Sequence, residues 1–450
     1  METKAKIDDS PAREGAPKRI HLTTLGCSKN TYDSEILLGQ LRSRNAQIVE
    51  APESADVIII NTCGFIEMAK QESIEAILEA EQLKKDYPGK KVVVCGCLSQ
   101  RYATELRAEM PGIDGIFGTE DYANILKFLD YDPRLSPEFL YEQRILTTSK
   151  HYAYLKISEG CNHTCAFCAI PLMRGRHRSR PLEQIIDEAR RLADQGVKEL
   201  IIISQDTTFY GLDLYQSQRL VELLEQLEAV EGIEWIRLHY LYPTTVQDRL
   251  IDYMAGSAKV VPYLDMPVQH ISDRMLKIMK RGGKAHRIRN IFEQAREKIQ
   301  DVTLRTTFIV GHPGETESDF QALKEFVEAF RFDRMGVFTY SHEEKTSAYE
   351  LEDLDPEVKQ ARYDELMQVQ RQISFDNNQQ KHGKTCRVIV DEIDWTAMNA
   401  FGRTAGDSPE IDNEVVITDL NRALRVGEFV NVEIFDVSEY ELYGKLKDSP

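Results

Sequence analysis

Three cysteines in one short stretch are the feature that most limits what this chain can fold into. Cys161, Cys165 and Cys168 are separated by three and by two residues, and they follow closely on the apolar segment 153–157. Three thiolates in one loop can hold three irons of a cubane cluster while the fourth iron lacks a protein ligand. Because a metal needs an open position to bind a substrate, this loop predicts a reactive centre at the end of a strand.

A structural zinc site is the alternative for the same loop. Zinc in such a site prefers four protein ligands, and His163 lies inside the loop and offers the fourth. The spacing of the three cysteines favours an iron–sulfur cluster over zinc.

Residues 19–130 alternate short apolar runs with helical patterns. The expected strands are 19–25, 56–60 and 91–94, and the expected helices are 33–44, 67–85 and 100–109. This rhythm of strand–helix–strand units predicts an open parallel α/β sheet. Residues 131–150 contain Pro133 and Pro137 and show little periodicity, so we expect a linker there.

The rhythm resumes after the linker. The expected strands are 153–157, 199–203, 235–238, 263–266, 304–310 and 334–338. The expected helices are 181–195, 216–229, 272–280, 287–300, 317–331 and 356–380. Six strand–helix units predict a partial (β/α)6 barrel, whose chemistry lies at the carboxyl ends of its strands.

After Gly383 the chain changes to short strands separated by turns, at 384–392, 401–403, 414–417, 429–434 and 442–446. This pattern predicts a small antiparallel β-barrel. The fold class is therefore α/β with an added β-barrel. The expected divisions are a flexible tail at 1–18, an N-terminal domain at 19–132, a linker at 133–146, a central domain at 147–378 and a C-terminal barrel at 379–447.

Three further cysteines, Cys27, Cys63 and Cys97, each come at the end of a predicted strand and beside a glycine. The carboxyl ends of parallel strands line one crevice, so these thiols can converge, and glycine lets the backbone approach a bulky cluster. The alternative is that they are inert buried thiols. We expect Cys95 and Cys386, which lie inside strands, to be core thiols.

Composition limits the partners and the compartment. The net charge is −18, which does not suit a general nucleic-acid binder and predicts no DNA partner. No apolar stretch reaches the roughly 18–20 residues that cross a bilayer, and residues 1–18 do not resemble a signal peptide. We therefore expect a cytoplasmic protein with no membrane partner, in a compartment that keeps thiols reduced.

The cysteine loop, with Phe167 before its last cysteine, resembles the signature of the radical S-adenosylmethionine superfamily. The resemblance implies a 4Fe-4S cluster on Cys161, Cys165 and Cys168. It also implies that S-adenosylmethionine chelates the open iron through its amino and carboxylate groups, with Phe167 near the adenine.

The chain after residue 18 resembles the methylthiotransferase family, and especially the branch that modifies an aspartate of ribosomal protein uS12. The segments that carry this resemblance are 25–30, 33–35, 159–163, 203–206, 263–270, 308–316, 402–403 and 409–412. It implies a TRAM-type C-terminal barrel and a second 4Fe-4S cluster on Cys27, Cys63 and Cys97. It further implies that a radical made at the first cluster activates the β-carbon of the aspartate, and that the second cluster donates the methylthio group. An electron donor such as flavodoxin or ferredoxin would supply the first cluster.

The sequence departs from the family pattern at a few positions. Ser28 stands where the family often has proline, and His312 stands where it often has phenylalanine. Cys95 has no counterpart among the expected ligands.

Polar residues and glycines at the ends of the barrel strands are further candidates for binding S-adenosylmethionine, but none can be assigned as catalytic from the sequence. These candidates are Gln205, Asp206, Arg237, Gln269, His270, Gly311 and Glu315. The alternative for each is an ordinary hydrogen-bonded loop or core group.

Two other functions compete with the uS12 enzyme. One is a transfer-RNA adenosine C2 methylthiotransferase, and the other is an iron–sulfur scaffold or electron carrier without catalysis. Residues 381–450 hold 8 Lys+Arg and 14 Asp+Glu, so the C-terminal barrel is acidic, which favours a basic protein over transfer RNA. The basic stretch 174–180 either contacts ribosomal RNA or orders a loop.

Overall fold

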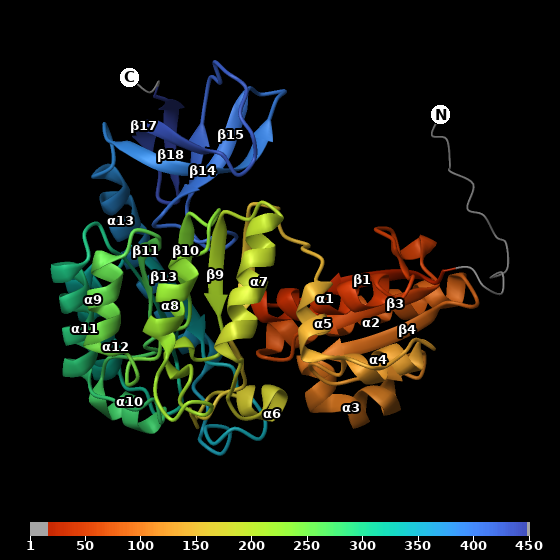
Figure 1. Cartoon of the computed structure of the whole chain (residues 1–450). Helices are drawn as coiled ribbons and strands as arrows, with labels where there is room; N and C mark the ends of the chain where they lie inside the picture. The colour runs from red at the N-terminus through yellow and green to blue at the C-terminus, as the bar shows by residue number, and fades with distance from the viewer. Residues whose placement is uncertain (1–16, 448–450) are drawn as a thin grey trace, which may run out of the picture. The chain divides into compact units, whose positions relative to one another are not determined.

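The computed structural model describes residues 17–447, apart from the side chains of 137–139 (Figure 1). The chain divides into two compact units, residues 1–147 with 172–175, and residues 148–171 with 176–450. Most of the tail that we expect at 1–18 lies outside the described residues.

A five-stranded parallel sheet forms the first unit, in the order β2-β1-β3-β4-β5. Its strands are β1 Arg19–Thr24, β2 Gln47–Ile48, β3 Val57–Thr62, β4 Lys91–Gly96 and β5 Gly115–Ile116. The apolar runs of β3 and β4 are buried, and Ile60 and Val94 share one core cluster with Ile77 of α2. The predicted open parallel sheet is confirmed.

The helices of this unit are α1 Ser28–Arg42, α2 Glu67–Asp86, α3 Cys97–Glu109, α4 Tyr122–Phe128 and α5 Pro137–Glu142, with the short 3-10 helix η1 Pro52–Ser54. Helix α1 begins five residues before the predicted start at Asp33, because Lys29 and Asn30 are buried polar residues that no apolar pattern marks. Helix α5 lies in the expected linker. A buried ion pair of 2.5 Å between Arg144 and Glu35 ties the linker to α1.

A six-stranded parallel sheet forms the frame of the second unit, in the order β13-β12-β11-β10-β9-β6. Its strands are β6 Tyr152–Lys156, β9 Glu199–Ile203, β10 Trp235–Leu238, β11 Val260–Asp265, β12 Thr303–Val310 and β13 Arg334–Thr339. The first and last of these strands, β6 and β13, are the two edges, so the barrel is partial. A separate antiparallel pair joins β7 Ser158–Glu159 to β8 Arg178–Ser179.

Helices lie between successive strands of this sheet, and the last of them, α13, follows β13 (Figure 1). They are α6 Ile170–Arg174, α7 Leu182–Asp194, η2 Thr207–Phe209, α8 Leu220–Glu228, α9 Asp248–Gly256, α10 Asp273–Ile278, α11 Ala285–Lys298, α12 Glu317–Phe330 and α13 Pro356–Gln379. Helix α9 was not predicted. It has only nine residues, and Leu250, Ile251 and Met254 are its buried side chains, which is too short a run for a clear helical period.

The C-terminal strands close into a barrel, in the order β14-β15-β16-β18-β17. They are β14 Thr385–Asp394, β15 Asn399–Thr404, β16 Glu414–Ile417, β17 Phe429–Val437 and β18 Glu441–Leu446. The pairings are antiparallel as predicted, except that β16 and β18 pair in parallel. Cys386 packs against the apolar core of this barrel, as expected for a core thiol.

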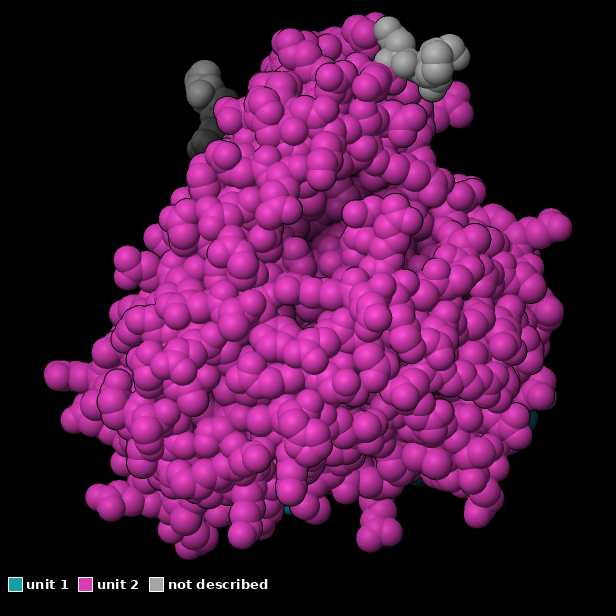
Figure 2. All heavy atoms as spheres, turned by 90° about the vertical axis from the view of Figure 1, so that its left-hand side faces the viewer, with its two compact units in different colours: residues 1–147, 172–175 teal, residues 148–171, 176–450 magenta. Residues whose placement is uncertain are grey.

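The β-barrel and the parallel sheet belong to one unit, and Figure 2 shows one face of it. Strand β15 and the segment that follows it carry buried charges that pair with the first residues of two sheet strands. Asp407 pairs with Arg334 at 2.5 Å, and Arg403 pairs with Glu199 at 2.8 Å. These contacts fix the β-barrel at the amino ends of the strands and leave their carboxyl ends to the cysteine loop.

Within the described residues, none of the helices combines the length and apolar character needed to span a bilayer.

Two candidate cysteine centres

The loop that carries Cys161, Cys165 and Cys168 comes after β7 and before α6. Its middle is held by two backbone hydrogen bonds: the N–H of Ala166 donates to Met279 O at 2.8 Å, and Ala166 O accepts from Ala348 N at 2.8 Å. The loop is therefore pinned between the end of α10 and the segment that follows β13.

His163 is engaged within the protein. Its Nε2 lies 2.7 Å from Asp206 Oδ2, and its ring stacks on Tyr242 with a centroid distance of 3.6 Å and an angle of 6°. Among the described residues, His163 belongs to no group of three ligand atoms that lie within 4.8 Å of one another, whereas the ligands of a tetrahedral zinc lie that close together. The donor set of the loop is therefore three thiols, which fits a cubane cluster with one open iron.

Burial controls the protonation of two of these thiols, Cys161 and Cys168. It raises the pKa of Cys161 to about 11, against a hydrogen bond from the backbone N–H of His163 and the positive charge of Arg281. Burial also raises the pKa of Cys168 to about 12. Without a metal these two thiols are protonated and inert near neutral pH, because the thiolate is the nucleophile and the metal ligand.

Gln205 and Asp206, two of the predicted cofactor residues, lie beside the loop. Asp206 accepts hydrogen bonds from the hydroxyl of Thr208 at 2.6 Å and from the N–H of Phe209 at 3.1 Å, in addition to its contact with His163. Gln205 Nε2 donates to Glu159 Oε1 at 2.8 Å. The other amide atom, Gln205 Oε1, is buried and has no hydrogen-bond partner among the described residues.

His270, Gly311 and Glu315 form a hydrogen-bonded group of their own. The ring nitrogen Nδ1 of His270 accepts two backbone N–H groups at 2.9 and 3.0 Å, so Nε2 is the protonated nitrogen, and it lies 3.3 Å from Glu315 Oε1. The other oxygen of Glu315 accepts from the N–H of Gly311 and from Arg362. The polar atoms of these residues are therefore largely satisfied inside the protein.

Gln269 and Gly311 both have left-handed backbone conformations, with φ of 71° and 72°. A Cβ on Gly311 would lie 2.4 Å from the side chain of Lys359. The glycine at this position is thus explained by close packing as well as by its φ.

Phe167 packs with Ala166, Tyr340 and Ala348 beside the loop. His312, the departure from the family pattern, makes edge contacts with the rings of Phe167 at 6.4 Å and Tyr340 at 5.0 Å. Burial lowers the pKa of His312, so its ring packs in the neutral form near neutral pH.

Arg237 is the predicted cofactor residue that the structure does not bring to the loop. Its Nε lies 2.7 Å from Glu199, its Nη1 donates to Ala405 O at 2.8 Å, and it lies over the ring of Tyr263. Glu199 is the first residue of β9, Tyr263 lies within β11, and Ala405 directly follows β15 of the β-barrel. The order of the strands in the sequence does not predict whether the Arg237 side chain points toward the amino or the carboxyl end of β10.

The second centre lies in the first unit. Cys27 is the residue before α1, Cys63 follows β3, and Cys97 is the first residue of α3. A Cβ on Gly26 would lie 2.9 Å from Cys63 Sγ, which shows that the Cys27 turn approaches Cys63. Burial raises the pKa of Cys97 to about 12, and the nearby Cys27 and Cys63 add to this effect. The turn of Cys27 therefore lies close to Cys63, and both thiols influence Cys97; that the three hold one cluster stays a prediction.

Arg174 is a residue of this centre that the sequence did not identify as part of it. Although it follows the cysteine loop in sequence, it groups with the first unit. Its guanidinium lies 2.6 Å from Asn30 Oδ1 and 3.0 Å from Asp33 Oδ2, and its charge lowers the pKa of Cys97 against burial. The basic stretch 174–180 marked this region in the sequence, but the sequence did not show which of its residues is buried beside the second centre.

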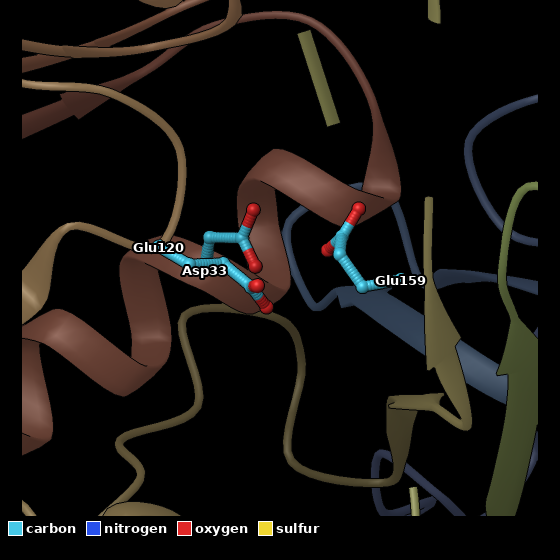
Figure 3. Close-up of side chains that lie close together, drawn as sticks. All are labelled: Asp33, Glu120 and Glu159. Carbon is cyan, nitrogen blue, oxygen red and sulfur yellow. The ribbon is translucent and has the colours of Figure 1, made fainter. Parts of the chain in front are cut away.

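Two carboxylates of the first unit lie close to one another (Figure 3). Oxygens of Asp33, on α1, and of Glu120, before α4, are within 4.8 Å of each other. Glu159, also drawn in Figure 3, belongs to the second unit, where it pairs with Lys156 at 2.7 Å.

Cys95 is buried within β4. Its role as a core thiol stays a prediction.

Comparison with known proteins gives three family matches along the chain. Residues 19–118 match the uncharacterized protein family UPF0004, residues 155–327 match the radical SAM superfamily, and residues 383–446 match the TRAM domain.

Curated relatives match nearly the whole chain. The ribosomal protein uS12 methylthiotransferase RimO of Flavobacterium johnsoniae is 50% identical over 431 residues, covering 95% of this chain and 98% of that protein. The enzyme of the same name from Aquifex aeolicus is 51% identical over 429 residues, covering 95% and 97%. Among solved structures, the radical S-adenosylmethionine methyltransferase TsrM from Kitasatospora setae has a TM-score of 0.54 at 13% identity, covering 72% of this chain and 75% of that one. This last likeness concerns the fold.

Proposed function

Because the chain belongs to the ribosomal protein uS12 methylthiotransferase RimO family, we propose that it adds a methylthio group to an aspartate of uS12. The reaction is radical chemistry on S-adenosylmethionine, and the group is attached at the β-carbon of the aspartate. The observation that carries the proposal is the pair of separate three-thiol sets in a chain about 50% identical to these enzymes. One set suits a radical source and the other a sulfur store.

An iron–sulfur cluster and S-adenosylmethionine are the cofactors of the family, and we assign two 4Fe-4S clusters to this chain. Cys161, Cys165 and Cys168 hold the first. Cys27, Cys63 and Cys97 hold the second. When bound, the first cluster supplies the electron that splits the sulfonium of S-adenosylmethionine, which is chemistry that the protein itself cannot provide.

The residues of this chain position the first cofactor pair. Asp206 holds His163 and so fixes the cysteine loop, while Gln205 offers a buried amide oxygen to a ligand donor. Phe167 lies with Ala348 and Tyr340 beside the loop and forms an apolar wall there. We therefore keep Phe167, Gln205 and Asp206 as cofactor contacts.

The remaining predicted contacts have weaker support. Gln269 and Gly311 contribute backbone geometry, and His270 and Glu315 hold each other. We propose that these four residues do not contact the cofactor directly but support the residues that do. Arg237 is not retained as a cofactor contact, because its guanidinium is bound to Glu199 and Ala405.

The protein substrate is favoured over transfer RNA. The similarity to uS12 enzymes extends over 95% of the chain, and the C-terminal barrel is acidic, so it attracts a basic ribosomal protein and repels a phosphate backbone. We further propose that a flavodoxin or ferredoxin supplies the electron and that the reaction takes place in the cytoplasm.

The test is to incubate the anaerobically reconstituted protein with S-adenosylmethionine, a reductant and purified uS12. We expect 5′-deoxyadenosine and a uS12 peptide heavier by one methylthio group, located by tandem mass spectrometry on an aspartate. Isolated transfer RNA in the same mixture is the control substrate. A methylthio group on RNA with unmodified uS12 would contradict the proposal, and so would the absence of 5′-deoxyadenosine from protein that carries its iron.

A further inference from the structure

Arg281 is a buried cation beside the cysteine loop of the second unit. It follows helix α10 and is only 8% exposed. Its Nη1 lies 3.7 Å from Cys165 Sγ, and its Nη2 donates to the carbonyl oxygen of Pro267. The guanidinium carbon lies 4.1 Å from the centroid of the Tyr242 ring. Of the three loop cysteines, Cys165 is the one that this arginine touches.

In the part of the chain that the structure describes, no carboxylate balances this charge. Within residues 17–447, no acidic oxygen lies within 4.0 Å of the Arg281 guanidinium, and its Nε has no hydrogen-bond partner. A buried charge is costly unless an opposite charge or hydrogen bonds compensate it. The negative groups that the loop itself offers are the thiolates that form when a metal binds. The arginine is thus placed as their countercharge.

Tyr242 holds Arg281 in position from two directions. Its hydroxyl donates to the carbonyl oxygen of Arg281 and lies 3.8 Å from Cys165 Sγ. The same ring stacks with His163 at 3.6 Å, and two groups this close to one centroid must lie on opposite faces. The guanidinium is therefore fixed by a ring that Asp206 and His163 support in turn.

We propose that Arg281 is a positioning residue that raises the reduction potential of the cluster held by Cys161, Cys165 and Cys168. The inference rests on the proposed assignment of those three ligands. Reduction adds one electron, supplied by the donor, to a cluster that its thiolates already make negative. A fixed positive charge and an N–H directed at a ligand sulfur stabilise the reduced form more than the oxidised form. The low-dielectric surroundings strengthen this effect.

The test compares reduction potentials of the reconstituted full-length protein and its variants, measured by redox titration with the electron paramagnetic resonance signal of the reduced cluster as readout. To isolate this cluster, every protein also carries Cys97→Ala, which removes a ligand of the other centre. We expect Arg281→Gln to lower the ratio of reduced to oxidised cluster about tenfold at a fixed solution potential, which is a shift of the reduction potential by about 59 mV to more negative values for one electron. Arg281→Lys keeps the charge and should restore part of the shift.

Lys280→Gln is the matched control, because it removes the same charge from the neighbouring, exposed residue. Its potential should equal that of the parent protein. Tyr242→Phe, which loses the hydroxyl that holds Arg281, should shift the potential in the same direction as Arg281→Gln but less.

The proposal is overturned if the Arg281→Gln variant still binds about four irons per chain, to within about one iron, and has the same reduction potential as the protein that carries Cys97→Ala alone. If the Arg281→Gln variant does not bind its cluster, the Tyr242→Phe variant is the test. An unchanged reduction potential in Tyr242→Phe then overturns the proposal. Failure of the proposed function is a separate outcome. It would appear in the unsubstituted protein, which would then bind no iron or form no 5′-deoxyadenosine.

Discussion

The two cysteine centres differ in how the arginine beside each is balanced. In the first unit, Arg174 is paired with Asp33 at 3.0 Å and hydrogen-bonded to Asn30. In the second unit, Arg281 faces Cys165, and no carboxylate is within ion-pair distance among the residues described. A balanced cation changes the local potential little, whereas an unbalanced one biases its site toward extra negative charge. The difference agrees with the proposed roles of the two centres, a sulfur store in the first unit and an electron acceptor in the second.

The centres also differ in how the chain builds them. One takes its three thiols from a single loop between Cys161 and Cys168, while the other gathers Cys27, Cys63 and Cys97 from three separate strand ends. The loop needs local anchoring by Ala166, whereas the dispersed set exists only if the whole parallel sheet forms. Loss of sheet structure should therefore damage the dispersed centre first.

The largest effect should come from removing one thiol in each centre. Cys165→Ala and Cys97→Ala should each lower the iron content from about eight to about four per chain. Cys165→Ala should abolish 5′-deoxyadenosine formation, whereas Cys97→Ala should keep it and lose only transfer of the methylthio group. Iron analysis and mass spectrometry check this, with Cys386→Ala as the control that keeps both activities. Equal phenotypes for the first two variants would break the comparison.

Metal binding to the protein without its clusters should strengthen as the pH rises. Burial raises the pKa of Cys161 to about 11 and that of Cys97 to about 12, so both thiols must release a proton to bind a metal. Each released proton makes binding up to about tenfold tighter per pH unit below the pKa. Titration with Co²⁺ between pH 6 and 8, followed by thiolate charge-transfer absorption, measures the slope. A pH-independent affinity would contradict the protonated state of the thiols.

The loop anchor should have a moderate effect on stability. Asp206→Ala removes the partner of His163 and the acceptor of Phe209 N, so it should destabilise the protein by roughly 1–3 kcal/mol, the usual cost of leaving buried polar groups unpaired. Chemical denaturation of the cluster-free protein measures this. Asp213→Ala, which removes an exposed contact to Ser179, is the control with a smaller expected loss.

The smallest effect should come from the balanced pair. The double change Arg174→Gln with Asp33→Asn removes both charges at once and should shift the potential of the first unit's cluster less than Arg174→Gln alone. Redox titration in a Cys165→Ala background isolates this cluster. An equal shift from the single and double variants would mean that Asp33 does not balance Arg174.

Much of the fold could be predicted from sequence because its strands are short apolar runs and its helices have a clear period. Strands β9 and β16 have the predicted limits, and β12 agrees within one residue. Helix α9 and the early start of α1 were missed, because nine residues give little periodicity and because buried polar residues such as Asn30 do not look like core. The parallel pairing of β16 with β18 joins strands that are not neighbours in the chain, so no local pattern reveals it.

The candidate site divides in a similar way. The thiol sets at Cys161 and at Cys27 were found from spacing and from position after strands, which are properties of the chain in one dimension. Arg237 was expected to contact the cofactor and instead pairs with Glu199. The partner of a side chain in the interior of the sheet depends on the neighbouring strands, which the sequence of one strand does not reveal. Arg281 was not identified at all, since no spacing connects it to Cys165, 116 residues away.

The sequence by itself determined the type and order of most elements and predicted the two sets of thiols as metal ligands, because these depend on residue type and on short spacings. Only the tertiary structure decided which charges stand beside those thiols and whether each one is paired. Electrostatic effects act over a few ångströms of space, and residues far apart in the chain, such as Arg174 and Asp33, become neighbours only when the chain has folded.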